Sequence, residues 1–236
     1  DAPVLGSLID VNTAYYEGKA EGKPAPWQVL LEARTATDDE AKTAQVTAQG
    51  LAMAAKLLSQ NYNLVATNVP YLARGKQRET LKDFCENYFP EAKADLATVF
   101  LERCMDFSPI GGTSTIVLPQ NWLFLTSYRK FREKLLRQNT WHSVVRLGAK
   151  GFQTPMWDFN VQLIILSKGL LSGDTLLQGL DVSVPKSASE KAERMLVESF
   201  ESVKQANLLA NPDARVYFEN ESSLTLLSKY ADGILV

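Results

Sequence analysis

Histidine is almost absent from this 236-residue sequence, and its scarcity excludes several kinds of catalytic site. The one histidine, His142, cannot form a metal centre that needs a pair of imidazole ligands. A hydrolase with a histidine base would have to depend on that single ring. A nucleotide-phosphate loop is absent as well, because Gly75-Lys76 lacks the earlier glycine and is followed by Gln77 instead of serine or threonine.

Cysteine and long hydrophobic runs are scarce too. Cys85 and Cys104 are an isolated pair without metal-ligand spacing, so we expect reduced thiols in or near the core of a cytoplasmic protein. No apolar run approaches the roughly 20 residues of a membrane-spanning helix, and the first residues lack the basic and then apolar pattern of a secretion signal. Because 45% of the residues are hydrophobic, the chain can still fill a core, and the sequence predicts a globular protein.

Positive charge is not in excess, since the net charge is −2 and the isoelectric point is near 5.6. A chain with this balance does not bind DNA phosphates over its whole surface, so any contact with nucleic acid must be local. One candidate is a basic cluster that follows residue 73. Its members are Arg74, Lys76, Arg78 and Lys82. A second basic run, at 129–137, is more typical of a solvated helix face.

The segment 64–71 is the centre of our interpretation. Its apolar start predicts a buried strand, which stops at Asn68 because Pro70 cannot continue a ladder of hydrogen bonds. Ligands of open parallel sheets bind outside the carboxyl ends of the strands. An asparagine, a turn stiffened by proline and Tyr71 at such an end therefore predict a binding site.

The chemistry of this segment suits a planar amine. The side-chain oxygen of Asn68 and the main-chain carbonyl of Val69 form a pair of acceptors that can receive both N–H bonds of an exocyclic amino group. Tyr71 can offer a ring face to the base that carries this amine. These groups together predict a pocket for a flipped-out adenine. The alternative is a plain turn, in which Asn68 caps the loop and Tyr71 packs on the core.

Asn68-Val69-Pro70-Tyr71 resembles the Asn-Pro-Pro-Tyr signature of amino-group DNA methyltransferases, which methylate adenine with S-adenosylmethionine. Residues 95–100 and 111–122 are similar, in the same order, to the helix, turn, strand and loop that follow the signature. The resemblance implies an adenine-specific methylase of the large restriction or phage-defence type, with Asp95 as a cofactor contact. It also implies double-stranded DNA as a partner, together with restriction or phage-defence subunits.

A second aromatic residue is implied by the same resemblance. Gly151-Phe152, followed by the apolar run 161–165, is similar to the family stretch whose aromatic ring closes over the flipped base. Phe152 is therefore a second candidate for base stacking. Trp157 and Phe159 are close enough in sequence to take the same role. An ordinary core phenylalanine is the alternative for any of these rings.

The sequence departs from the family pattern at a few positions. Val69 stands where the signature has proline, although a β-branched residue also favours an extended backbone and keeps a carbonyl. Ala97 stands where the following helix usually has tyrosine, which puts a cofactor or pocket contact there in doubt. These departures leave an alternative function open, that of a non-catalytic DNA-binding or partner-binding module with a degenerate methylase fold.

The order of helical and strand patterns predicts an α/β fold, Rossmann-like, with a mostly parallel doubly wound sheet and flanking helices. The predicted strands are 64–68, 113–118, 143–147, 161–166 and 216–218. The predicted helices are 46–58, 96–107, 128–135, about 189–203 and 221–230. Residues 170–184 are expected to be irregular.

The domain organisation follows from these elements and from the resemblance. Residues 1–40 are expected to be a loop or insertion, 41–170 the carboxyl-terminal half of a methyltransferase domain, and 171–236 a helical extension toward a target-recognition region. The cofactor loop of the family is rich in glycine, but no Gly-x-Gly occurs in this sequence. We therefore expect a fragment that lacks the cofactor-loop half and is inactive by itself.

Overall fold

The chain consists of two compact units, residues 1–62 and 63–236. The computed structural model describes residues 2–11, 39–153, 159–170 and 175–218. The first unit contains the helix α1 (Ala2–Leu5), the 3-10 turn η1 (Gly6–Leu8) and the long helix α4 (Asp39–Leu58). The predicted helix at 46–58 is part of α4. Every helix in the described ranges is too short or too polar to cross a bilayer.

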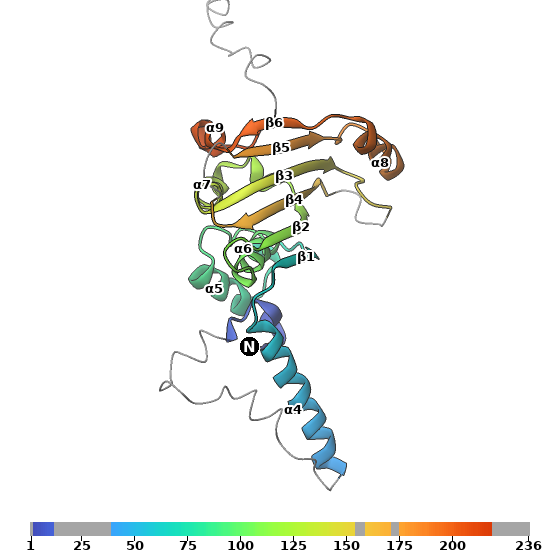
Figure 1. Cartoon of the computed structure of the whole chain (residues 1–236). Helices are drawn as coiled ribbons and strands as arrows, with labels where there is room; N and C mark the ends of the chain where they lie inside the picture. The colour runs from blue at the N-terminus through green and yellow to red at the C-terminus, as the bar shows by residue number, and fades with distance from the viewer. Residues whose placement is uncertain (1, 12–38, 154–158, 171–174, 219–236) are drawn as a thin grey trace, which may run out of the picture. The chain divides into compact units, whose positions relative to one another are not determined.

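A six-stranded sheet forms the centre of the second unit (Figure 1). Its strands are β1 (Leu64–Asn68), β2 (Thr113–Pro119), β3 (Asn139–Gly148), β4 (Val161–Lys168), β5 (Leu176–Asp181) and β6 (Glu201–Lys204). They lie in the order β1-β2-β4-β3-β5-β6. The four strands predicted between residues 64 and 166 are thus confirmed, and β3 begins earlier than predicted.

The sheet is mixed rather than mostly parallel. β1 and β2 are parallel, as are β3 and β5, but β4 is antiparallel to both of its neighbours and β6 is antiparallel to β5. Parallel strands need a long crossover, usually a helix, whereas β3 and β4 are joined by residues 149–160 without a helix in the described part. The α/β class with flanking helices is confirmed, and the expected mostly parallel order is corrected, because β4 is antiparallel to both of its neighbours.

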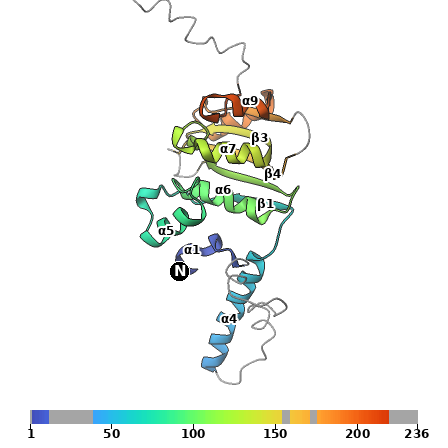
Figure 2. The ribbon, with the colours of Figure 1, turned by 90° about the vertical axis from the view of Figure 1, so that its left-hand side faces the viewer.

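Helices flank the sheet. They are α5 (Glu79–Tyr88), α6 (Leu96–Phe107), α7 (Arg129–Gln138), α8 (Ala188–Val197) and α9 (Gln205–Ala210). α6 and α7 cover one face, whereas α8 contributes Met195 to an apolar cluster on the other face. Figure 2 shows α6 and α7 one above the other along the strands. On the face that α6 and α7 cover, the ring centroid of Trp122 lies 5.5 Å from that of Phe131 in α7 and 5.7 Å from that of Trp141 in β3. All three rings are buried, so they form the core between α7 and the sheet.

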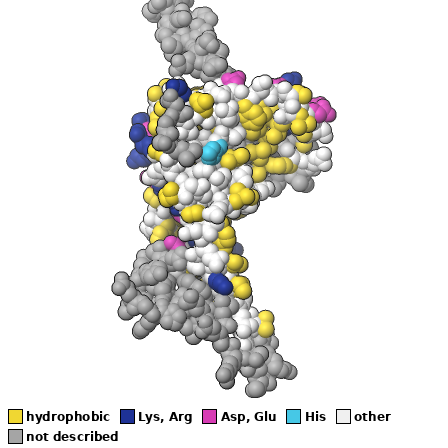
Figure 3. Space-filling view, in the orientation of Figure 1, with side chains coloured by type: hydrophobic (Ala, Val, Ile, Leu, Met, Phe, Trp, Pro, Cys, Tyr) yellow, Lys and Arg dark blue, Asp and Glu magenta, His cyan; other side chains and the backbone are white. Residues whose placement is uncertain are grey.

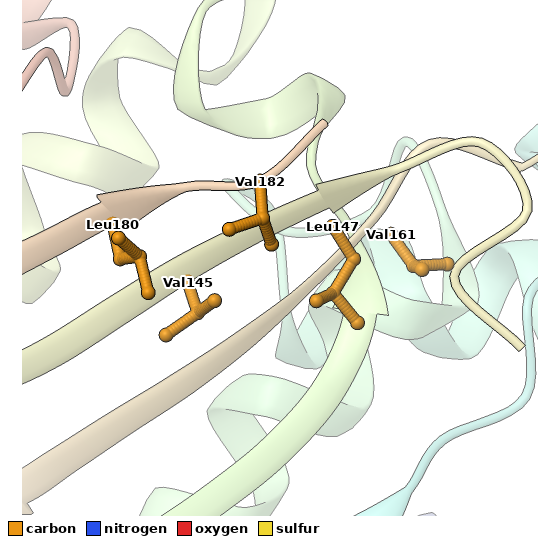
Figure 4. Close-up of a cluster of buried hydrophobic side chains, with 5 residues drawn as sticks. All are labelled: Val145, Leu147, Val161, Leu180 and Val182. Atoms are coloured by element: carbon orange, nitrogen blue, oxygen red, sulfur yellow. The ribbon is translucent and has the colours of Figure 1, made fainter. Parts of the chain in front are cut away.

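A smaller apolar cluster lies on the other face, near the carboxyl ends of β3 and β5 (Figure 4). Its buried members are Val145, Leu147, Val161, Leu180 and Val182. Tyr71, Leu163 and Met195 pack against them and are partly buried. The end of β1 shares this face, because Asn68 pairs with Val117, Val117 with Leu163, and Leu163 with Val145 across the sheet. Figure 3 shows the same face, with hydrophobic side chains across the strands. The cyan side chain is His142, which forms a hydrogen bond with Ser167, and Ser167 forms one with Thr113 on this face of β2.

A buried lysine fixes the strand ends next to this cluster. The ammonium of Lys191 in α8 donates to the carbonyl oxygens of Leu147, Ser183 and Val182 at 2.6, 3.0 and 3.2 Å. Burial lowers the pKa of this ammonium, because the charge has left water. Gly148 has a φ of +67° and approaches Ser183 so closely that a Cβ there would lie 2.7 Å from the serine Cβ. The carboxyl ends of β3 and β5 are therefore held together.

Several sequence-based expectations need correction. β1 was expected to be buried, but it lies at the edge of the sheet, and the side chain of Leu64 is 63% exposed. Residues 170–184 were expected to be irregular but contain β5. The predicted helix beyond 197 is wrong, because residues 201–204 form β6, and residues 216–218 form no strand. The helix predicted at 221–230 lies outside the described residues. Cys85 and Cys104 are buried and free, as expected.

The second basic run is partly solvated, since Arg129, Lys130 and Arg137 are exposed, and partly structural. Lys134 pairs with Glu91 at 3.3 Å and with Glu102, and Arg129 pairs with Glu133 at 2.8 Å. Arg132 is fully buried. Its guanidinium donates to the carbonyl oxygens of Trp122, Leu125, Asp213 and Ala214. Asp213 and Ala214 both have positive φ values, of 56° and 51°, so the turn that contains them is strained. Arg132 holds this turn against α7 through its hydrogen bonds.

We predict that Arg132→Leu destabilises the chain by about 3 kcal/mol or more, since it leaves several buried carbonyl groups without donors. The exposed Arg137→Leu on the same helix is the matched control and should change the free energy of unfolding by less than about 0.5 kcal/mol. Urea unfolding followed by circular dichroism measures both. Equal stability of the two variants would show that the Arg132 hydrogen bonds contribute nothing net.

Candidate base pocket at the carboxyl edge of the sheet

The predicted site residues follow the last residue of β1. Asn68 is exposed at the strand end, and Pro70 is exposed in the turn that follows. The side chain of Val69 is only 4% exposed, and its N–H donates to the carbonyl of Val117 in β2 at 3.4 Å. Val69 is therefore a buried anchor of the turn, and its carbonyl group follows directly at the strand end.

Tyr71 turns back toward the strand end. Its hydroxyl donates to Oδ1 of Asn68 at 3.1 Å, so the ring and the amide are in contact. Burial, and secondarily the negative charge of Asp95, raises the pKa of Tyr71 from 10.0 to about 12. The phenol is therefore neutral at physiological pH and remains a donor. Asn68 Oδ1 keeps a second lone pair for another N–H.

The aromatic neighbour of Tyr71 is Phe159. The two ring centroids are 5.6 Å apart with an interplanar angle of 66°, an edge-to-face contact. Phe159 is 47% exposed and Phe152 is 38% exposed, but within the described part of the chain only Phe159 makes a ring contact with Tyr71. Trp157 lies outside the described residues. Phe152 as a stacking residue stays a prediction, with Phe159 placed beside the site.

Asp95 supports the site from the next helix. It is the N-cap of α6, and its Oδ1 accepts the N–H of Ala97 at 2.9 Å and the N–H of Leu72 at 3.3 Å. A bridge between Ala73 and Asp95 adds backbone pairing. This carboxylate therefore joins the turn after Tyr71 to the start of α6. Its predicted cofactor contact stays a prediction.

A cavity of about 270 Å³ opens beside Asp95. Small side chains, including Ala73 and Ala97, form part of its wall, and Asn121 and Tyr128 come from the segment after β2. Ala97 is the position where the resembled family usually has tyrosine. The cavity is large enough for a small planar group, and its mostly apolar wall suits a ring rather than a phosphate. Among the described residues no group of histidine, cysteine and carboxylate side chains could hold a metal ion.

The first basic cluster divides into paired and free residues. Arg74 pairs with Glu86 at 2.6 Å and Lys82 pairs with Glu79 at 3.3 Å. Lys76 and Arg78 are exposed and have no ion pair with any described residue. They follow Tyr71 by a few residues in the sequence and, among the described residues, are the exposed, unpaired members of this cluster.

The mixed sheet with its flanking helices defines an α/β protein. The chain belongs to the Eco57I restriction-modification methylase family, whose profile matches residues 10–152. It is 32% identical over 151 residues to the adenine-specific methyltransferase BrxX of Escherichia coli O9:H4 (strain HS), covering 64% of this chain and 12% of that protein. It is 29% identical over 151 residues to the adenine-specific methyltransferase PglX of Lacticaseibacillus casei (strain Zhang), covering 63% and 12%. The chain thus spans about 12% of the length of these relatives.

Solved structures of restriction-modification enzymes have a similar fold. A nuclease-deletion mutant of the Type ISP enzyme LlaGI in complex with a DNA substrate mimic has a TM-score of 0.53 at 11% identity, over 80% of this chain and 21% of that one. A DrdV–DNA complex has a TM-score of 0.52 at 19% identity, over 75% and 20%. These identities support the shared fold alone.

The raised pKa of Tyr71 predicts a pH dependence. Between pH 10 and about 12 the unfolded phenol has lost its proton while the folded one keeps it, so stability falls as the pH rises through this window. Tyr71→Phe removes this phenol and should lose less stability over the same range. Urea unfolding of both proteins measures the difference, and absorbance of the phenolate locates the transition. A phenolate that forms near pH 10 would contradict a buried, protonated Tyr71.

Proposed function

We propose that this chain supplies the base pocket of an adenine-specific DNA methyltransferase that acts in restriction-modification or phage defence. The observation that carries this function is the grouping of Asn68, the Val69 carbonyl and the Tyr71 ring at the carboxyl end of one strand. Membership of the methylase family and two relatives named adenine-specific methyltransferases support it. Residues 41–170 would then form the carboxyl-terminal half of the catalytic domain.

The acceptor pair explains the choice of an amine. Asn68 Oδ1 and the carbonyl of Val69 each accept one N–H of the adenine amino group, which orients the nitrogen and raises its electron density. S-adenosylmethionine, when bound, supplies the methyl group from its sulfonium. The nitrogen forms the new N–CH₃ bond and then releases a proton to solvent, so the chain needs no charged base. The role of these residues is to orient and to polarise.

The aromatic pair explains how the base is held. A flipped base needs a π-face, and Tyr71 offers its ring beside the acceptors. Phe159 contacts that ring edge-on, so it lies beside the site and would have to move away from Tyr71 to pack on the other side of an inserted base. We propose Phe159 as the second ring, with Phe152 as the candidate from the sequence. Lys76 and Arg78 supply phosphate contacts next to the flipped nucleotide.

The described residues could hold only part of S-adenosylmethionine. The cavity beside Asp95 can take a planar or methyl-bearing end of S-adenosylmethionine. One carboxylate oxygen of Asp95 is used by two backbone N–H groups, which limits this residue to its other oxygen. The carboxylate and amine of the cofactor need a glycine-rich turn that this sequence does not contain.

Asn68→Ala tests the acceptor pair. In the whole protein it should lower methyl transfer by about 100-fold or more, because one of two polarising contacts is lost. The free energy of unfolding should change by less than about 1 kcal/mol, because Asn68 is exposed. Transfer of a labelled methyl group to a DNA duplex measures the first effect. Asn87→Ala, at an exposed position of α5, is the control and should retain full activity. Unchanged turnover in Asn68→Ala would overturn the assignment of the site.

Tyr71 tests the stacking role. Base stacking on an aromatic ring contributes roughly 1 to 3 kcal/mol, so Tyr71→Ala should weaken capture of an extruded base by about tenfold to a hundredfold. Tyr71→Phe keeps the ring and should retain most of this capture. Fluorescence of 2-aminopurine at the target position reports extrusion. Equal losses in both variants would show that the hydroxyl bond to Asn68, rather than the ring, holds the base.

A further inference from the structure

The parallel ladder between β1 and β2 has a regular pattern of hydrogen bonds. The N–H of Thr113 donates to the carbonyl of Asn63 at 2.9 Å, and each step of two residues repeats this arrangement along the strands. Asn68 is the partner of Val117, and the N–H of Val69 donates to the Val117 carbonyl at 3.4 Å. The next bond of the ladder would run from the N–H of residue 119 to the carbonyl of Val69.

Residue 119 is a proline, so this bond cannot form. Pro119 has no N–H, and the ladder is interrupted at the carbonyl that the proposed function assigns to the adenine amine. No described residue donates a hydrogen bond to that carbonyl in place of Pro119. The burial of Val69 and its N–H bond to Val117 anchor the strand directly before this carbonyl. The carbonyl therefore follows an anchored strand end and is unpaired among the described residues.

Pro119 is the last residue of β2, and it interrupts the pairing on one side only. β2 continues to pair with β4 through the partners Pro119 and Val161, and the N–H of Gln120 donates to the carbonyl of Asn160 at 2.8 Å. Pairing therefore runs past Pro119 on the β4 side and is interrupted only on the side of β1. A proline is otherwise unfavourable inside a sheet, where it removes a ladder bond.

We propose that Pro119 is a positioning residue of the base pocket, which keeps the Val69 carbonyl free for the adenine amine by removing the N–H that would otherwise occupy it. This inference rests on the proposed function. It adds a residue from the neighbouring strand, which also lines the cavity beside Asp95 and acts on the amine only through the Val69 carbonyl. It also predicts that an ordinary residue at 119 improves the sheet and impairs the reaction.

The structural part of the proposal can be tested on this chain without any activity. Pro119→Ala introduces an N–H at the ladder position opposite Val69. Hydrogen exchange measured by NMR should show a protected amide at residue 119, and the isotope-labelled carbonyl of Val69 should absorb at lower infrared frequency than in the wild type. An amide that exchanges as fast as an exposed one, with an unshifted carbonyl band, would overturn the proposal.

The functional part uses the whole protein and methyl transfer. Pro119→Ala should lower kcat by about tenfold or more, which corresponds to loss of roughly one hydrogen bond in the transition state, with little change in KM for DNA. Replacement of Pro119 by lactic acid, which joins the chain through an ester, again lacks an N–H and should restore most of the activity. Pro90→Ala, at an exposed turn, controls for the loss of a proline elsewhere.

The outcomes separate this inference from the proposed function. If the wild-type whole protein transfers no methyl group to adenine, the proposed function fails, while the exchange and infrared results still decide whether Pro119 frees the carbonyl. If the wild type is active and Pro119→Ala keeps wild-type kcat with a protected amide, the free carbonyl is not needed and the inference fails. If both the Ala and the lactic acid variants lose activity equally, the proline ring rather than the missing N–H matters, and the inference fails as well.

Discussion

The parallel pairing of β1 with β2 is the constraint on which the candidate site depends. It places Asn68 level with Val117 and fixes the peptide of Val69 through a hydrogen bond to β2. The turn that follows is then tied to α6, because Asp95 accepts the N–H of Leu72. A small displacement of either attachment would move the two acceptors relative to each other. A displacement of about 1 Å can greatly reduce the rate of a reaction that depends on oriented contacts. The position of the edge strand therefore determines the geometry of the proposed pocket.

The proposed pocket contains neutral groups rather than charged ones. Its acceptors are an amide oxygen and a main-chain carbonyl, and Tyr71 remains protonated because burial raises its pKa. A carboxylate in the position of Asn68 would attract cations and water, whereas neutral acceptors select a donor with two N–H bonds by geometry. The nearby carboxylate, Asp95, is engaged by backbone N–H groups at the start of α6. Charge is placed outside the pocket, on the exposed Lys76 and Arg78.

Local patterns made the strand at 64–68 and the helix at 96–107 predictable, since each has its own periodicity and an end signal such as Asn68 or the Asp95 cap. β5 was missed because its sequence contains Gly179, which argues against a strand. In the fold this glycine is required, because a Cβ there would lie 2.3 Å from the ring of Phe218. The sequence also provided no basis for choosing Phe159 rather than Phe152 as the second aromatic residue of the site. Its contact with Tyr71 joins segments far apart in sequence, and no local pattern encodes that distance.

The departure at Val69 from the resembled signature acquires a physical meaning in this structure. A proline at this position would stiffen the backbone by its ring but could not donate a hydrogen bond. Val69 instead donates its N–H to the Val117 carbonyl and buries its side chain, so the ladder and the core restrain the same peptide group that a ring would restrain. The restraint leaves the carbonyl untouched, because Pro119 supplies no competing donor from β2. An anchored strand end and a missing N–H on the neighbouring strand together leave the Val69 carbonyl unpaired, and recognition of an amine requires an unpaired acceptor.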